Sequence, residues 1–132
     1  PPTAVVKAFI THGHGGGRTS GAEPNILYRL AADKDCEIVW KGHSHTFALH
    51  SPIPMLSMPN RGEIPENATV YYKYAANWGS YLYTYQACPS TYASRANYPV
   101  RPMYTVETRV HPFHQQTDGV EQPHIEMLPL HL

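Results

Sequence analysis

The chain has little charge and no excess of either sign. Only 15% of its 132 residues are charged, and ten Lys and Arg residues balance ten Asp and Glu residues. A protein that holds nucleic acid over a broad surface needs a basic face, so this balance argues against that class of function. It still allows a small positive pocket of the size of a phosphate group.

Long hydrophobic runs are absent, and cysteine is scarce. No stretch reaches the roughly 20 apolar residues that a membrane-spanning helix needs, and the N-terminus shows no signal-peptide pattern, so we expect no membrane partner. Cys36 and Cys88 are too far apart for a CxxC metal site. We expect two buried thiols, and one disulfide is the alternative.

The hydrophobic fraction of 42% is sufficient for one domain with its own core, covering residues 1–132. Residues 5–11 and 36–40 are apolar, β-branched runs that predict buried strands. Between them, residues 22–33 have the apolar spacing of a helix, and Ser20, Glu23 and Pro24 mark its start as a capping box with an early proline. The chain therefore begins with a βαβ unit.

The second half of the sequence favours antiparallel strands. Four prolines predict short segments between residues 46 and 65. A hairpin is expected around residues 77–79, and later strands are expected near residues 103–110 and 124–130. Most of the ten tyrosines fall in these segments and suit sheet faces better than nucleobase stacking. The expected fold class is α/β or α+β.

Histidines follow both predicted strands of the βαβ unit. His12 comes directly after the first strand, and His43 and His45 follow the second within "GHSH". Ligands bind at the carboxyl ends of parallel strands, and neutral imidazole suits Mn, Fe, Zn and Ni. We interpret these three histidines as metal ligands. His14 is a candidate proton donor beside His12, although a solvated loop histidine is an equal alternative.

A run of glycines separates His14 from the helix. Gly15, Gly16 and Gly17 allow backbone amides to approach an anion, and Arg18 adds charged donors before a helix N-terminus. A tight turn without a ligand explains the same glycines. Two metal ions beside a phosphate-binding loop would activate water for attack on phosphorus.

Three motifs resemble the C-terminal half of the calcineurin-like metallophosphoesterases, especially bacterial and phage members. They are "HGHGGGRTSGAEPN", "NWGSYL" and "YASRANYP", together with "GHSH". The resemblance covers roughly residues 5–105. It implies a β-sandwich flanked by helices, in which His12 and His43 bind one metal ion of a pair and His45 binds the other.

The family's N-terminal motifs, DxH, GDxxD and GNH[DE], do not occur in this sequence. The resemblance therefore implies that the bridging carboxylate comes from elsewhere. We expect this chain to be the C-terminal portion of a larger metallophosphoesterase domain that hydrolyses a phosphoester substrate, with the other half on a preceding segment or a partner chain. The alternative is an inactive structural protein in a larger assembly such as a virion. On either interpretation we expect the chain in the cytoplasm or a virion rather than secreted.

Overall fold

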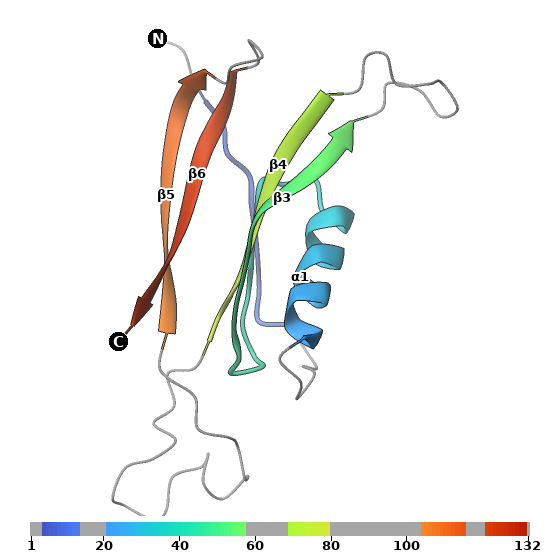
Figure 1. The fold of residues 1–132 in the computed structure, drawn as a ribbon, viewed down its shortest axis with the longest axis vertical. Coiled ribbons are helices and arrows are strands. Elements are labelled where there is room, and N and C mark those ends of the chain that lie inside the picture. Colours follow the sequence, from blue (N-terminus) through green and yellow to red (C-terminus); the bar gives the residue numbers. More distant parts are fainter. Residues whose placement is uncertain (1–3, 14–20, 58–68, 80–103, 116–120, 132) are drawn as a thin grey trace, which may run out of the picture.

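Three layers make up the described part of the chain: a helix, a four-stranded sheet and a two-stranded sheet (Figure 1). The computed structural model describes residues 4–13, 21–57, 69–79, 104–115 and 121–131. The elements in chain order are β1 (Ala8–Thr11), α1 (Ala22–Asp33), β2 (Ile38–Lys41), β3 (Phe47–Ser57), β4 (Thr69–Trp78), β5 (Tyr104–Gln115) and β6 (Glu121–His131). This is the expected α+β fold, with a single helix and mostly strands among the described residues.

The larger sheet has the strand order β1-β2-β4-β3. β1, β2 and β4 run parallel, and β3 pairs with β4 in the antiparallel direction. The register aligns Thr11 with Lys41 and Lys41 with Asn77, so the three parallel strands end at nearly the same level. This alignment brings the loops after these strands together at one edge of the sheet.

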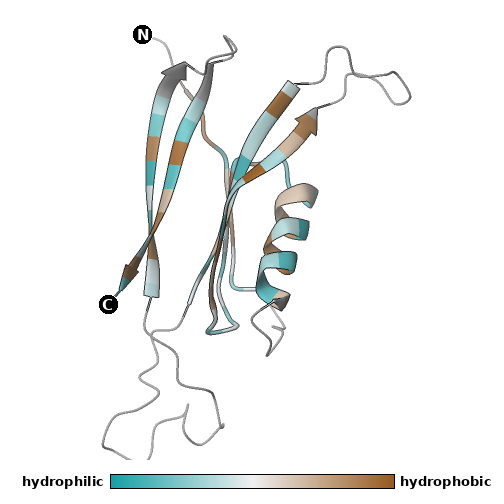
Figure 2. Cartoon of the chain, in the orientation of Figure 1, coloured by the Kyte–Doolittle hydropathy of each residue, from teal (hydrophilic) through white to brown (hydrophobic). Residues whose placement is uncertain are grey.

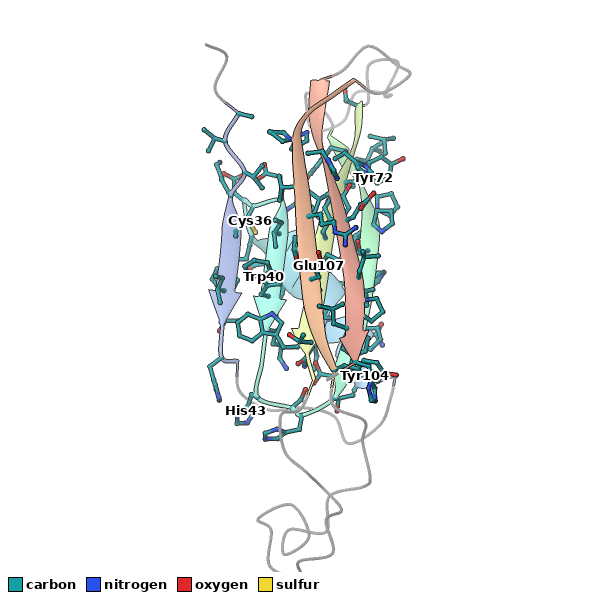
Figure 3. The ribbon with its side chains drawn as sticks, turned by 90° about the vertical axis from the view of Figure 1, so that its left-hand side faces the viewer. Cys36, Trp40, His43, Tyr72, Tyr104 and Glu107 are labelled. Atoms are coloured by element: carbon teal, nitrogen blue, oxygen red, sulfur yellow. The ribbon has the colours of Figure 1, made fainter. Side chains whose placement is uncertain are left out.

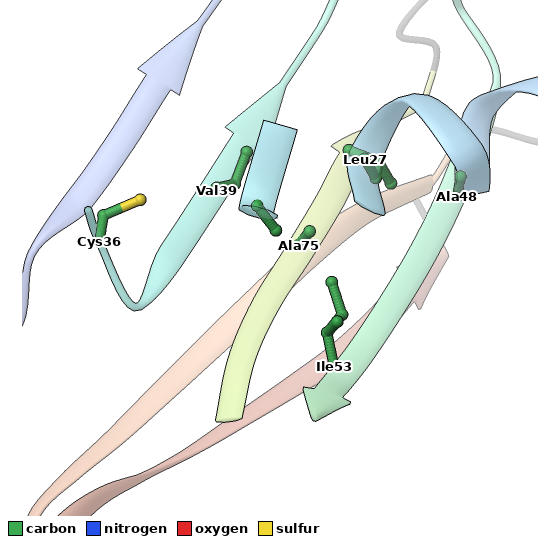
Figure 4. Packing of buried hydrophobic residues seen from close by; sticks show 7 residues of the cluster. Leu27, Cys36, Val39, Ala48, Ile53 and Ala75 are labelled. Carbon is green, nitrogen blue, oxygen red and sulfur yellow. The ribbon is translucent and has the colours of Figure 1, made fainter. Parts of the chain in front are cut away.

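One face of the larger sheet is covered by α1. Leu27 and Ala31 are four residues apart, so they lie on the same side of the helix, and both are fully buried. Figure 2 shows hydrophobic residues on the side of α1 that faces the sheet. This part of the core, drawn in Figure 4, contains Leu27, Ala31, Cys36, Val39, Ala48, Ile53 and Ala75.

The opposite face of the larger sheet packs against β5 and β6. The buried residues between the two sheets are Ile38, Tyr74, Ala76, Ile125 and Met127. β5 and β6 cover β3 and β4 but not β1, and Trp40 of β2 lies at the edge of the covered area (Figure 3). Ile10 of β1 consequently remains 57% exposed.

The helix C-terminus is fixed by a lysine from the sheet. Lys73 on β4 is buried, and its ammonium donates hydrogen bonds to the backbone oxygens of Ala31, at 2.7 Å, and Lys34. The last carbonyls of a helix have no partner within the helix and carry partial negative charge. A buried cation at this position therefore both satisfies the carbonyls and stabilises the helix dipole.

The βαβ unit and the helix bounds are confirmed by the structure, since β1 and β2 are parallel neighbours and α1 spans residues 22–33. The late strands are also confirmed as an antiparallel pair, although each is longer than predicted. The expected hairpin at residues 77–79 has its first strand in β4, while its second strand, at residues 80–86, lies outside the described residues.

The prediction of short segments after residue 45 was wrong for β3. This strand runs without a break from Phe47 to Ser57 despite Pro52 and Pro54. β3 is an edge strand, where a missing backbone N–H costs no hydrogen bond if it faces away from the neighbour. Its pairing with β4 also shifts register between His50 and Ile53, which accommodates the first proline.

The structure bears on two further expectations. Among the described residues no helix is both long and apolar enough to cross a membrane. Cys36 is a buried free thiol, and Cys88 lies outside the part of the chain that the structure describes. Burial raises the pKa of the Cys36 thiol above its ordinary value, since the charged thiolate is poorly solvated in the core.

Candidate metal centre

Two of the predicted ligands meet where β1 and β2 end. His12 follows β1 directly, and His43 follows β2 after a single glycine. Their imidazole rings lie edge to face, with centroids 4.9 Å apart and planes inclined by 70°. Both side chains are exposed, and Nδ1 of His12 lies 3.2 Å from the Gly13 carbonyl oxygen. Figure 3 shows His43 beyond the end of β2, at the edge of the sheet.

The loop after β2 has an unusual backbone. His43 has a φ of 76° and His45 a φ of 52°, in the left-handed region that residues other than glycine rarely adopt. Such a residue costs of order 1–3 kcal/mol and persists only where its surroundings fix it. Strained residues of this kind concentrate at functional sites, so the conformation supports a role for this loop.

Hydrogen bonds hold the loop in this conformation. The Gly42 amide donates to the Thr11 carbonyl at 3.1 Å, which ties the loop to the end of β1. The Ser44 amide closes a tight turn onto the Gly42 carbonyl, also at 3.1 Å. The Thr46 hydroxyl donates to the Ser44 carbonyl at 3.2 Å. The position of His43 is therefore determined by contacts on both sides of it.

The other predicted site residues are only partly placed. His45 follows two residues after His43 and is half-buried. His14, Gly15, Gly16, Gly17 and Arg18 lie outside the described residues, so the proposed phosphate-binding loop and proton donor stay predictions. Within the described ranges, no group of three or more His, Cys, Asp or Glu side chains is arranged to hold a metal ion.

A buried ion pair lies beneath the two histidine loops. Glu23 of α1 is fully buried, and Lys41, the last residue of β2, is only 2% exposed. The Lys41 ammonium donates to both carboxylate oxygens of Glu23, at 3.1 and 3.3 Å, and to the Gly42 carbonyl at 3.3 Å. All three of its N–H groups therefore have acceptors, as a buried ammonium requires.

Asn77, at the end of β4, joins this pair to the histidine loop. Its amide nitrogen donates to Glu23 at 3.0 Å and to the Ser44 hydroxyl at 2.6 Å. Its amide oxygen accepts a hydrogen bond from the Gly79 backbone at 3.3 Å. The side chain is fully buried, and these contacts use both of its donors.

Sequence reasoning missed this network. Glu23 was interpreted as the partner of Ser20 in a capping box, but the helix begins after Gly21 without a side-chain cap, and the Glu23 carboxylate turns to Lys41 instead. The available signal was a lysine at the end of an otherwise apolar strand, where a cation needs a buried partner. The sequence alone does not say which carboxylate that partner is.

The arrangement can bind one divalent ion through two imidazoles. Zinc–nitrogen bonds are about 2.0–2.1 Å long, so two nitrogens that share one ion lie within about 4 Å of each other. Rings whose centroids are 4.9 Å apart can present nitrogens at such a spacing. Two imidazoles leave positions for further ligands and for water.

Comparisons with protein-family models, curated proteins and solved structures give no match for this chain. A functional assignment therefore depends on the geometry of the histidine loops and on the chemistry of their side chains.

Proposed function

We propose that this chain contributes histidine ligands to a metal-dependent phosphoester hydrolase. The observation that carries the proposal is the contact between the His12 and His43 rings at the carboxyl ends of two neighbouring parallel strands. His45 is the proposed third ligand, bound to a second ion, and Mn, Fe, Zn or Ni are the candidate metals. The resemblance of the sequence motifs to metallophosphoesterases supports the same assignment.

Each residue has a limited task in this proposal. His12 and His43 would present ring nitrogens to the ion, and the left-handed backbone at His43 sets where its side chain leaves the loop. Arg18 and the glycines at 15–17 would bind the phosphate oxygens, and His14 would donate a proton to the leaving group. A bound metal ion would polarise the phosphoryl group and lower the pKa of a coordinated water. The acidic ligands would come from a preceding segment or from a partner chain.

Metal binding tests the proposal without requiring the rest of the site. Equilibrium dialysis with Zn²⁺ is expected to show one ion bound per chain, at His12 and His43, because the second ion beside His45 needs the acidic ligands that come from elsewhere. Changes to residues that merely support a ligand weaken metal binding by about 10–100-fold, so His12→Ala or His43→Ala should weaken it by at least about 100-fold. Hydrolysis of bis(p-nitrophenyl) phosphate should follow metal content once the acidic half is supplied.

The control uses a second pair of neighbouring histidines. His111 and His124 lie on β5 and β6 with ring centroids 5.6 Å apart, away from the ends of the parallel strands. His111→Ala should leave zinc affinity unchanged. If His111→Ala and His43→Ala lower the affinity equally, binding reflects imidazole content rather than a site, and the proposal is wrong.

A second candidate is a structural protein without activity. The observation that favours it is the apolar surface on β1 and just before it, where Val5 is 73% and Ile10 57% exposed on a strand at the sheet edge. Such an edge favours pairing with another strand. On this alternative, the purified chain would bind no stoichiometric metal, and Ile10→Lys would prevent its assembly.

A further inference from the structure

We propose that Glu23, Lys41 and Asn77 are positioning residues, which hold the two histidine loops at the separation needed to share one metal ion. The inference rests on the proposed metal site and concerns residues that do not themselves bind metal. It is carried by the buried polar network described above, which contacts both loops and links them to α1.

Lys41 is in contact with the loops after both β1 and β2. A Cβ atom added at Gly13 would lie 3.0 Å from Cε and 3.2 Å from Cγ of Lys41, so the lysine stem packs directly under the residue that follows His12. Gly13 has a φ of 73°, which places its backbone against this stem. The ammonium of the same side chain donates to the Gly42 carbonyl, just before His43. A single side chain therefore sets the spacing between the two loops.

Asn77 and Glu23 fix the other side of the second loop. Asn77 binds the Ser44 hydroxyl and the Glu23 carboxylate with the same amide nitrogen, so Ser44, next to His43, is connected to the first turn of α1. Glu23 also receives the Lys41 ammonium. The network therefore approaches His43 from both neighbouring residues, which is what a strained left-handed residue requires in order to persist.

The location of the network within the sheet separates this role from simple core packing. On the helix side of the sheet, the preceding inward position on β2 and on β4 is apolar, namely Val39 and Ala75. At the last aligned positions, directly beneath the histidine loops, the buried side chains Lys41 and Asn77 are polar instead, while the other buried lysine of this face, Lys73, lies at the opposite end of α1. Burying an ion pair costs free energy that apolar residues of similar volume avoid. The polar layer therefore serves the loops rather than the stability of the core.

The test compares two changes at buried lysines of the same sheet. The double variant Glu23→Gln/Lys41→Met removes both charges together and keeps similar side-chain volumes, so it avoids leaving a single buried charge. Lys73→Met is the matched control, because Lys73 is also buried but contacts the far end of α1 instead of a histidine loop. Co²⁺ is the probe, and its dissociation constant and visible absorption spectrum are measured for each folded variant.

The double variant is expected to bind Co²⁺ about 10–100-fold more weakly than the unmodified chain, with an altered absorption spectrum. Lys73→Met should lower the unfolding midpoint but leave Co²⁺ affinity and spectrum unchanged. Should the double variant fail to fold, Ser44→Ala is the milder variant, because it removes the hydroxyl that accepts a hydrogen bond from Asn77. This variant is expected to lose several-fold in Co²⁺ affinity. Unchanged affinity in both the double variant and Ser44→Ala would overturn the proposal.

A metal-free measurement separates this inference from the proposed function. The nuclear Overhauser effect between ring protons of His12 and His43 should be strong in the unmodified chain and in Lys73→Met, and weak in the double variant. If the unmodified chain binds no Co²⁺, the proposed function fails, and the ring contact still decides whether the network positions the histidines. Persistence of that contact in the double variant contradicts positioning whether or not Co²⁺ binds.

Discussion

Removing the lysine of the buried ion pair should be one of the most damaging single changes in this chain. Lys41→Met leaves the Glu23 carboxylate fully buried, with Asn77 as its remaining hydrogen-bond donor among the contacts described above. Breaking a buried pair by removing one partner costs about 3–5 kcal/mol, because an uncompensated charge stays in the core. Domains unfold with about 5–15 kcal/mol in total, so this variant should be close to unfolding at room temperature.

Urea unfolding followed by tryptophan fluorescence measures this loss. Adding Glu23→Gln to Lys41→Met should recover most of the lost stability, since the double variant contains no buried charge at this position. Lys7→Met is the control, because Lys7 pairs with Asp35 at 2.7 Å, but the side chains are 56% and 96% exposed. That change should leave the unfolding curve unchanged within error. The reasoning is refuted if Lys41→Met resembles the control, or if the second substitution recovers nothing.

Other changes test separate parts of the structure. Gly13→Ala should cost about 1–2 kcal/mol in urea unfolding, because its positive φ is unfavourable for a residue with a Cβ and because that Cβ would meet Lys41. Gly21→Ala is the control and should cost less, because its Cβ enters open space and the backbone at Gly21 already has helical φ and ψ that alanine adopts. Lys73→Met should cost about 1–3 kcal/mol in the same assay, because the Ala31 and Lys34 carbonyls at the end of α1 lose this donor. Burial holds the pKa of the Cys36 thiol above 9.0, so as the pH rises the thiol loses its proton in the unfolded chain before it does so in the folded chain. The thiol's contribution to stability should therefore be complete below about pH 9 and decline as the pH rises further. Thermal unfolding at pH 8 and pH 10.5 should show a smaller decline in Cys36→Ala than in the unmodified chain, and equal declines would contradict the assigned shift.

The elements that sequence could predict are those whose signals are local. The apolar spacing of residues 22–33 gave the bounds of α1, and β-branched runs located β1 and β2. The juxtaposition of His12 and His43 also followed, because parallel neighbouring strands bring the loops after their carboxyl ends to the same edge. No side-chain geometry was needed for this expectation.

The features that sequence could not predict depend on tertiary neighbours. Pro52 and Pro54 signal breaks locally, but β3 is an edge strand and tolerates them. Glu23 has the correct spacing for a capping box, yet a buried lysine from β2 competes for its carboxylate more strongly than a backbone amide would. The left-handed backbone of His43 likewise follows from contacts with other strands rather than from its own residue type.

The most direct test of the central claim is an anomalous difference map from crystals of the full chain soaked in Zn²⁺. The proposed site predicts a peak beside the ends of β1 and β2, about 2.0–2.1 Å from one ring nitrogen of His12 and one of His43. No peak at these two rings under saturating zinc, with or without peaks at histidines elsewhere in the chain, would contradict the assignment of this edge of the sheet as a metal site.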